Sequence, residues 1–190
     1  MFNLDLDKLT PEQRAMVALW EAHQKAEFQD KDARASCNTM VANPYVNHVP
    51  VLTGGVGRRQ LERYYSRYFI PGQPPDVEIV LISRTVGQDR IVDEFVYRCT
   101  HSIPMDWLLP GVPPTGRRME IPTVVIITFE DGKMKSERLY WDQASARVQL
   151  GLLDAAGLPV AGVEVARKAL DPAAVPSNLL MKRTIADDLL

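Results

Sequence analysis

Cysteine is scarce in this sequence. Only Cys37 and Cys99 occur among its 190 residues, and neither belongs to a Cys-x-x-Cys pair or has the spacing of zinc ligands. In a reducing compartment, two isolated thiols are more often buried apolar side chains than a disulfide. We therefore assign no redox or metal chemistry to either cysteine.

Histidine is almost as rare, with three residues in the chain, His23, His48 and His101. No two of them are four residues apart or form a His-x-His pair, and Asp106 adds no such spacing to them. Preorganised metal sites usually draw their ligands from such spacings. The histidine pattern therefore predicts no metal site.

An excess of charge and a long apolar run are also missing. The chain has 22 Lys and Arg against 24 Asp and Glu, which offers no basic surface for nucleic acid or anionic lipid. The longest apolar run, residues 122–129, is far shorter than the roughly 18 residues that cross a membrane. The first residues lack the apolar segment of a signal peptide. We expect a cytoplasmic protein with no nucleic-acid partner and no membrane partner.

The sequence does contain enough apolar side chains for one core. Hydrophobic residues make up 46% of the chain, and 190 residues is a length typical of one domain. Intrinsic disorder is therefore not expected.

Helix signals dominate the first seventy residues. Residues 10–13 (Thr-Pro-Glu-Gln) combine a threonine cap, a proline at the first helical position and a glutamine three residues after the cap, which predicts a helix over 11–28. The apolar stripe of this helix includes Trp20 and His23.

Two further helices are expected before residue 72. A short one covers 30–40 and another covers 61–69, where apolar and aromatic residues recur at helical spacing. Between them the sequence predicts a proline-containing loop at 43–50 and a Gly-Gly turn at 54–55.

After residue 76 the pattern changes to that of strands. Branched and aromatic residues predict four strands, over 77–86, 90–103, 117–129 and 134–142. An Asp-Gly turn within 130–133 joins the last two, and short helices are expected at 144–153 and 163–170. Helices followed by an antiparallel meander predict an α+β fold.

Alternation assigns strand residues to faces of the sheet. On the second strand one face carries Asp93, Phe95, Tyr97, Cys99 and His101. On the last strand Arg138, Tyr140 and Asp142 lie opposite Glu137, Leu139 and Trp141.

Several short motifs resemble a known family. They are His101, PGVPPTGRRME at 110–120, FEDGK at 129–133, Trp-Asp at 141–142 and QLG at 149–151. Together with YVNH at 45–48 and the helix that begins near Gly57, this series resembles the SnoaL-like polyketide cyclases of the nuclear transport factor 2-like superfamily. The similarity covers about residues 12–153.

The resemblance implies a cone-shaped α+β barrel. In it, three N-terminal helices pack on a strongly curved, mixed or antiparallel sheet around an apolar cavity, and homodimers are frequent. It divides this chain into a SnoaL-like domain over 1–153 and a C-terminal extension over 154–190, for which we expect a place at a dimer interface.

The resemblance also suggests catalytic residues. In the cyclases an aspartate on the last strand is the general acid and base of an intramolecular aldol closure that uses no cofactor, and Asp142 matches it. His101 matches a histidine that lines the same cavity. The alternatives are that Asp142 caps the helix expected at 144–153 and that His101 is a hydrogen-bonded core residue.

Other side chains are candidates for substrate binding because of their place in loops, on strand faces or on the first helix. They are His48, Asn47, Tyr45, His23, Tyr97, Arg138, Tyr140 and Trp107. Arg138 in a cavity would favour an anionic or strongly polar ligand.

These patterns predict a cofactor-independent acid–base enzyme of the cyclase, isomerase or lyase type that binds a small carbonyl or lactone substrate. The alternative is a non-catalytic module that binds a small ligand or forms a dimer. A carboxymethylenebutenolidase-like lactone hydrolase is a third hypothesis, although the chain has no Gly-x-Cys-x-Gly or Gly-x-Ser-x-Gly elbow for a nucleophile.

Overall fold

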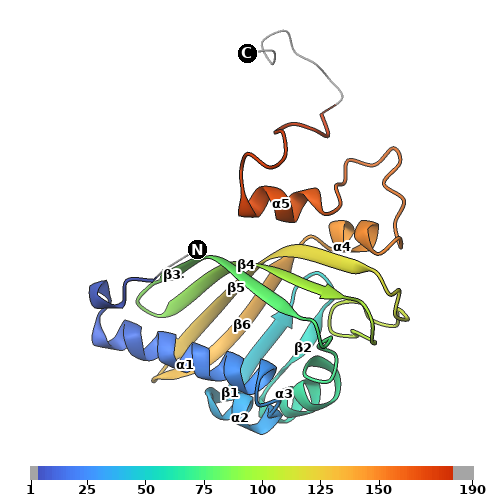
Figure 1. Cartoon of the computed structure of the whole chain (residues 1–190). Coiled ribbons are helices and arrows are strands. Elements are labelled where there is room, and N and C mark those ends of the chain that lie inside the picture. Colours follow the sequence, from blue (N-terminus) through green and yellow to red (C-terminus); the bar gives the residue numbers. More distant parts are fainter. Residues whose placement is uncertain (1–3, 182–190) are drawn as a thin grey trace.

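A computed structural model describes residues 4–181 (Figure 1). A 3₁₀ turn at Leu6–Lys8 comes first, and the helices are α1 (Pro11–Phe28), α2 (Ala33–Asn38), α3 (Arg58–Tyr64), α4 (Gln143–Gln149) and α5 (Glu164–Leu170). A π-helical turn, Tyr65–Phe69, continues α3. The strands are β1 (Met40–His48), β2 (Thr53–Val56), β3 (Glu78–Val86), β4 (Arg90–Thr100), β5 (Arg118–Glu130) and β6 (Lys133–Trp141).

The strands form one open sheet in the order β2-β1-β6-β5-β4-β3. β1 runs parallel to β6, and the other neighbours are antiparallel. The expected α+β class and the mixed sheet are confirmed, but the sheet does not close into a barrel.

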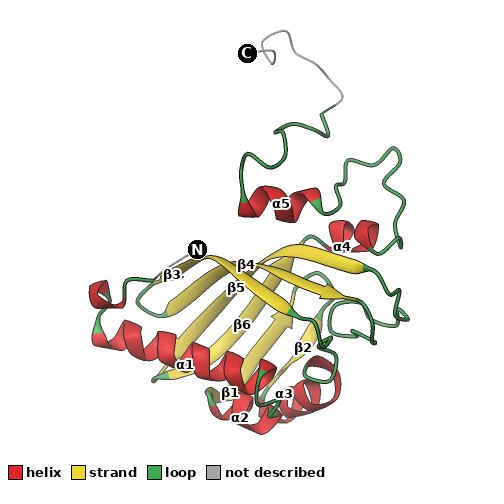
Figure 2. Ribbon diagram, viewed as in Figure 1, coloured by secondary structure: helices red, strands yellow, loops and turns green. Residues whose placement is uncertain are grey.

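The helices lie on both sides of the sheet. α1 crosses one face, here called the inner face, where it contacts β4 and β6 (Figure 2). α2 and α3 pack beside β1 and β2, while α4 and α5 rest against β5 from the other side. No helix within residues 4–181 is long and apolar enough to cross a membrane.

The start of α1 follows its sequence signal closely. The Thr10 hydroxyl accepts a hydrogen bond from the Gln13 backbone N–H, and the Gln13 side chain accepts one from the Thr10 backbone. This capping box satisfies two backbone donors that have no partner inside the helix. It fixes where α1 begins and therefore which of its residues face the sheet.

The β5–β6 hairpin also agrees with its sequence. Asp131 and Gly132 have φ values of 51° and 70°, the left-handed conformation that a tight hairpin turn requires. The turn sets the register in which Val125 pairs with Leu139 and Ile127 with Glu137. In this register both pairs of residues lie on the inner face.

The loop predicted at 43–50 is wrong, because most of this segment belongs to β1. Pro44 lies where the β1–β6 register shifts, and a proline is tolerated there because it removes no regular ladder hydrogen bond. The Gly-Gly turn predicted at 54–55 is also wrong, since both glycines pair with β1 in β2. Gly54 has φ 130°, and a Cβ atom there would collide with the Val46 carbonyl oxygen.

The segment after α4 extends away from the sheet before α5 returns to it (Figure 1). α5 contacts β5 and β4, and its residue Ala166 is buried. The Ser145 hydroxyl of α4 donates a hydrogen bond to the Gly162 carbonyl, which precedes α5. The expected C-terminal extension over 154–190 is thus described as far as residue 181, and residues 182–190 lie outside the description, as do residues 1–3 of the expected domain.

A buried ion pair joins the inner face to α1. Arg84 contacts both carboxylate oxygens of Asp93 at 2.7 Å, and the Trp20 indole N–H donates to Asp93 at 2.8 Å. The side chains of Arg84 and Asp93 are 7% and 2% exposed. Removing one member of such a pair leaves the other charge buried without its partner.

We predict that Asp93→Ala lowers the free energy of unfolding by about 3–5 kcal/mol in urea denaturation. The control is Glu78→Ala, which removes the half-exposed partner of Arg98 and should cost less than about 1 kcal/mol. Equal losses for the two variants would contradict this account of the Asp93 pair.

Candidate functional site

A narrow cavity lies between α1 and the inner face of the sheet. Its volume is about 30 Å³, which is room for one or two water molecules. The lining residues are Trp20, Gln24, Glu27, Phe28, Phe69, Ile79, Phe95, Tyr97, Trp107, Leu108, Ile121, Thr123, Val125, Glu137, Leu139 and Trp141. Most are apolar, and Glu27 and Glu137 are the two ionisable carboxylates among them.

Aromatic rings close one end of this cavity. The His48 ring lies 5.4–5.8 Å from the rings of Phe69, Trp107 and Trp141. Its Nδ1 atom is hydrogen-bonded to the Tyr64 hydroxyl. Burial lowers the pKa of His48 to about 3, so this imidazole is neutral and serves as part of the wall.

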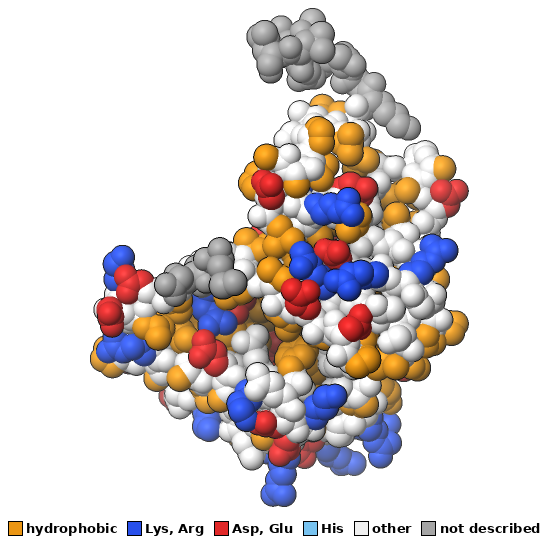
Figure 3. All heavy atoms as spheres, viewed as in Figure 1, with side chains coloured by type: hydrophobic (Ala, Val, Ile, Leu, Met, Phe, Trp, Pro, Cys, Tyr) orange, Lys and Arg blue, Asp and Glu red, His pale blue; other side chains and the backbone are white. Residues whose placement is uncertain are grey.

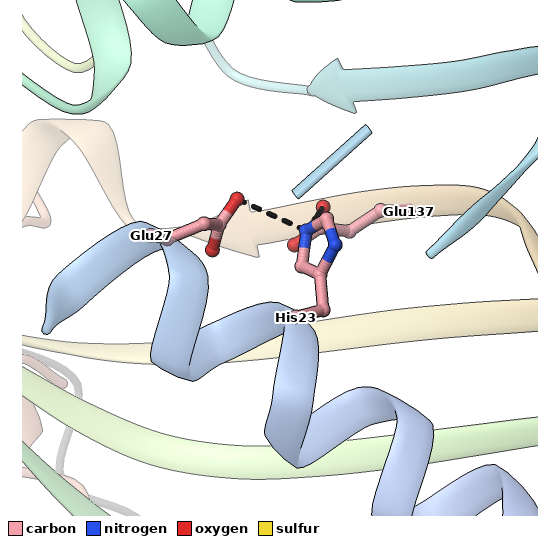
Figure 4. Close-up of side chains that lie close together, drawn as sticks. All are labelled: His23, Glu27 and Glu137. Atoms are coloured by element: carbon pink, nitrogen blue, oxygen red, sulfur yellow. Dashed lines mark ion pairs between the residues drawn. The ribbon is translucent and has the colours of Figure 1, made fainter. Parts of the chain in front are cut away.

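The polar end of the cavity is a cluster of His23, Glu27 and Glu137 (Figure 4). His23 and Glu27 are four residues apart on α1 and therefore share one helix face, while Glu137 reaches them from β6. His23 Nε2 lies 3.0 Å from Glu27 Oε1 and 3.8 Å from Glu137 Oε2. We call these three residues the carboxylate–histidine cluster.

Tyr65 completes the surroundings of the cluster. Its hydroxyl donates a hydrogen bond to Glu137 Oε2 at 3.4 Å and lies 3.4 Å from His23 Nε2. The residue is buried. The π-helical turn that begins at Tyr65 continues α3 without a break and carries this hydroxyl to the cluster.

The other ring nitrogen of His23 is held by α2 and the residue after it. Nδ1 lies 2.7 Å from Thr39 Oγ1 and 3.2 Å from the Ser36 carbonyl oxygen. The Thr39 hydroxyl donates its proton to the same carbonyl, at 2.7 Å. Both neighbours therefore act as acceptors, so Nδ1 carries a proton and Nε2 is the atom that faces the carboxylates.

Burial and mutual repulsion shift the ionisation of the cluster. Burial raises the pKa of Glu137 to about 8, and the charge of Glu27 adds to this effect. Burial alone would lower the pKa of His23, but the Glu27 carboxylate outweighs it and the net pKa is raised. Glu137 therefore keeps its proton at neutral pH, where an exposed glutamate would be ionised.

A second hollow, open to solvent, adjoins the cavity on the surface between α1 and strands β3 and β4 (Figure 3). Gln24, Phe28, Ile79 and Phe95 line both spaces. These four side chains form the wall between them.

The same cluster contains the donors that suit a metal ion. His23, Glu27 and Glu137 each offer one ligand atom, and these atoms lie within 4.8 Å of one another. All three residues are buried. It is the one such group within residues 4–181.

The sequence of residues 13–137 matches the family model described as the SnoaL-like domain. This chain belongs to the SnoaL-like domain family. The family that the sequence motifs predict is therefore confirmed.

Solved structures show the same fold at low sequence identity. TsrD from Streptomyces laurentii is 20% identical, with a TM-score of 0.59 over 77% of this chain and 100% of that one. A putative SnoaL-like polyketide cyclase from Jannaschia sp. CCS1 is 18% identical, with a TM-score of 0.62 over 77% and 99%. AclR, a putative hydroxylase from Streptomyces galilaeus, is 19% identical, with a TM-score of 0.56 over 75% and 88%. No relative was found among curated proteins.

Four of the residues that the sequence suggests for substrate binding lie at the narrow cavity between α1 and the inner face. Tyr97 and Trp107 line it, and the Trp107 indole N–H donates to the Gly72 carbonyl at 3.0 Å. His48 packs against the lining rings, and His23 belongs to the carboxylate–histidine cluster.

The other four lie elsewhere. Arg138 and Tyr140 occupy the face of β6 opposite Glu137, and Tyr45 and Asn47 occupy the corresponding face of β1. The alternation along β6 is as the sequence predicts, and the cavity lies on the face that carries Glu137, Leu139 and Trp141. α1 covers this face because its apolar stripe packs there. An anion-binding role for Arg138 inside the cavity is thus not supported.

The two residues suggested for catalysis also lie outside the cavity. Asp142 is exposed and caps α4, where its Oδ1 accepts a hydrogen bond from the Ser145 backbone N–H at 3.0 Å. His101 is fully buried, and its Nδ1 contacts Thr115 at the start of the segment that leads to β5. The structure brings neither residue to the cluster.

Sequence reasoning missed Glu27 and Glu137. Glu27 follows His23 by four residues on an apolar helix face, and a carboxylate in that position is a signal that could have been used. Glu137 shares its strand face with Leu139 and Trp141, which indicates burial. What the sequence did not contain was the contact between the two elements.

We predict that Asp142 stabilises the SnoaL-like domain as a helix cap. Asp142→Ala should lower the free energy of unfolding by about 1 kcal/mol, because the Ser145 N–H loses its acceptor. Asp142→Asn retains an acceptor and should change it by a few tenths at most. Urea denaturation of both variants checks this, and an equal loss in the two would exclude a capping role.

Proposed function

We propose that the protein is a cofactor-independent acid–base enzyme of the cyclase, isomerase or lyase type, acting on a small carbonyl or lactone substrate. The observation that carries the proposal is the buried carboxylate–histidine cluster at the polar end of an aromatic cavity. Membership of the SnoaL-like family and the likeness to a putative polyketide cyclase support it.

The charge of the cavity favours a neutral substrate. Its lining contains two carboxylates and, among the described residues, no Lys or Arg. An anionic ligand would face Glu27 and Glu137 in a buried space with only His23 to oppose them. A neutral ketone, ester or lactone avoids this repulsion and can accept hydrogen bonds at its carbonyl oxygen.

We assign complementary roles to the two carboxyl groups. Glu27 Oε1 is buried, lies 3.0 Å from His23 Nε2 and has no regular hydrogen-bond partner, and we assign it to accept the proton next to the substrate carbonyl. Glu137 carries the proton that moves to the carbonyl oxygen as the enol forms, and Tyr65 holds its Oε2 in place. The His23 side chain, fixed by Thr39, balances the negative charge. Reprotonation at a different carbon, or attack on a second carbonyl, then gives an isomer or a ring.

Substrate entry requires side chains to move. A cavity of about 30 Å³ does not hold a molecule with several carbon atoms. Phe28 is only partly buried and lies in the wall between the cavity and the surface hollow, so we infer that rotation of this ring opens a route to the cavity.

The expected activity is exchange of the α-proton with solvent. In D₂O, the wild-type protein should catalyse deuterium incorporation into members of a panel of small ketones, lactones and β-dicarbonyl compounds, followed by NMR. Glu27→Gln and Glu137→Gln should each lower the exchange rate by about 10²–10⁴-fold, the usual contribution of a positioned acid or base.

Asp142→Asn and His101→Asn are the matched controls, because neither residue reaches the cavity, and both should retain wild-type exchange. Thermal melting establishes that every variant is folded. Loss of exchange in Asp142→Asn with normal exchange in Glu137→Gln would overturn the assignment and return the catalytic role to Asp142.

A second candidate function, assembly through the C-terminal extension, is favoured by exposed apolar side chains. Those on this segment are Leu158, Leu179, Leu180 and Met181, with exposures of 46–61%. Figure 3 shows hydrophobic atoms gathered over this part of the molecule. Clusters of exposed apolar residues often mark interfaces, and we propose a homodimer that uses this surface.

We predict that the full chain is a dimer by light scattering and that Leu158→Glu combined with Leu180→Glu gives a monomer. A charged side chain at the interface has to be buried without a partner, which opposes association. The control is Leu52→Glu, at a still more exposed leucine (85%) between β1 and β2, which should leave the dimer intact. A full-length monomer would exclude this second candidate.

A further inference from the structure

We propose that His23, Glu27 and Glu137 bind a divalent first-row transition-metal ion of the Zn²⁺ type. The inference goes beyond the proposed function and rests on the geometry of the cluster. It does not require that the protein be an enzyme.

The spacing of the ligand atoms fits one ion. Ligand atoms that each lie about 2.0–2.1 Å from a tetrahedral ion are about 3.3–3.4 Å from one another. His23 Nε2 is 3.0 Å from Glu27 Oε1 and 3.8 Å from Glu137 Oε2. Small movements of the two carboxylates therefore place all three atoms around a common centre (Figure 4).

The orientation of His23 matches that of a metal ligand. Histidine ligands usually donate their second ring N–H to a carbonyl or another acceptor, which fixes the ring and leaves the other nitrogen free to coordinate. Thr39 Oγ1 and the Ser36 carbonyl oxygen accept from Nδ1 in this way. Nε2, the nitrogen that would coordinate the metal, consequently faces the two carboxylates.

An independent observation is the unsatisfied oxygen of Glu27. The residue is 2% exposed, and its Oε1 has no hydrogen-bond partner, although it lies close to His23 Nε2. Buried carboxylate oxygens are costly unless a proton, a donor or a cation satisfies them. Oε1 is directed toward the centre of the cluster, where an ion would satisfy it.

Charge balance also favours a divalent ion. With the ion in place of the protons, two carboxylates and a neutral imidazole carry two negative charges, and a divalent ion cancels both. Within the described residues that line the cavity there is no Lys or Arg to do so. The adjacent cavity of about 30 Å³ leaves room for a water molecule as a fourth ligand.

The donor set selects the class of ion. One imidazole nitrogen with two carboxylate oxygens suits Zn²⁺ and its first-row neighbours, whereas Mg²⁺ and Ca²⁺ prefer six or more oxygen ligands. We therefore expect Zn²⁺ and Co²⁺ to bind, and Mg²⁺ not to bind at similar concentrations.

The test is calorimetric titration of the full-length protein, freed of metal with a chelator and then dialysed, with Zn²⁺ or Mg²⁺. One Zn²⁺ per chain and no Mg²⁺ are expected. Co²⁺ should give the intense visible absorption of a tetrahedral site, and excess Zn²⁺ should abolish it. Failure of the wild-type protein to bind Zn²⁺ would overturn the proposal, whatever the variants do.

Variants locate the ion. Glu27→Gln and Glu137→Gln nearly preserve side-chain shape and should each weaken Zn²⁺ binding by more than about 100-fold, beyond the loss expected from an outer-shell change. Thr39→Val removes an acceptor of His23 Nδ1 without touching a ligand and should weaken binding by about 10–100-fold.

His101→Asn and Asp142→Asn are the controls, because they remove a buried histidine and an exposed carboxylate outside the cluster. Both should bind Zn²⁺ like the wild type. Binding that survives both Glu27→Gln and Glu137→Gln, or that is lost in His101→Asn, would place the ion elsewhere and overturn the proposal.

The two proposals fail separately. Proton exchange is measured with chelator present, so it reports on the metal-free cluster, and Zn²⁺ binding is measured without any carbonyl compound. Exchange without Zn²⁺ binding would remove only the metal site, and Zn²⁺ binding without exchange would remove only the acid–base function. If both occur, added Zn²⁺ should inhibit exchange and chelator should restore it, because Glu27 and Glu137 cannot coordinate the ion and transfer protons at the same time.

Discussion

The burial of three ionisable side chains between α1 and β6 is the constraint on which the inner side of this structure depends. Removing His23, Glu27 and Glu137 from water is unfavourable unless they neutralise one another. The cluster therefore has to form as a unit, with the helix and the strand in a defined register. A shift of one residue on β6 would turn Glu137 to the other face and leave His23 and Glu27 without it.

The rest of the fold fixes that register. The capping box at Thr10 determines where α1 begins, and the buried Asp93 carboxylate joins Trp20 of α1 to Arg84 of β3. On the other side, the tight turn at residues 131–132 sets the pairing of β5 with β6. These contacts lie at different points along α1 and the sheet, so together they hold the cluster at one end of the cavity.

The same constraint explains why the cavity is small and aromatic. Rings exclude water from the cluster without adding charge, and His48 contributes to this wall because burial keeps its imidazole neutral. A water-poor space strengthens electrostatic interactions among the groups that remain. The SnoaL-like fold thus supplies a scaffold in which the residues that line the cavity, rather than the fold itself, decide what binds and reacts.

Sequence alone determined the fold class, the family, the capped first helix and the Asp-Gly hairpin, because each depends on local patterns: cap residues, apolar periodicity and turn preferences. It also determined which residues alternate on each strand. It did not determine which face of β6 the helix covers, since that depends on how α1 docks. For this reason the sequence predicts Asp142 and Arg138 as cavity residues, whereas the carboxylates at the cavity are Glu27 and Glu137, which lie 110 residues apart in the sequence. Only the tertiary structure brings those two carboxylates to the same histidine.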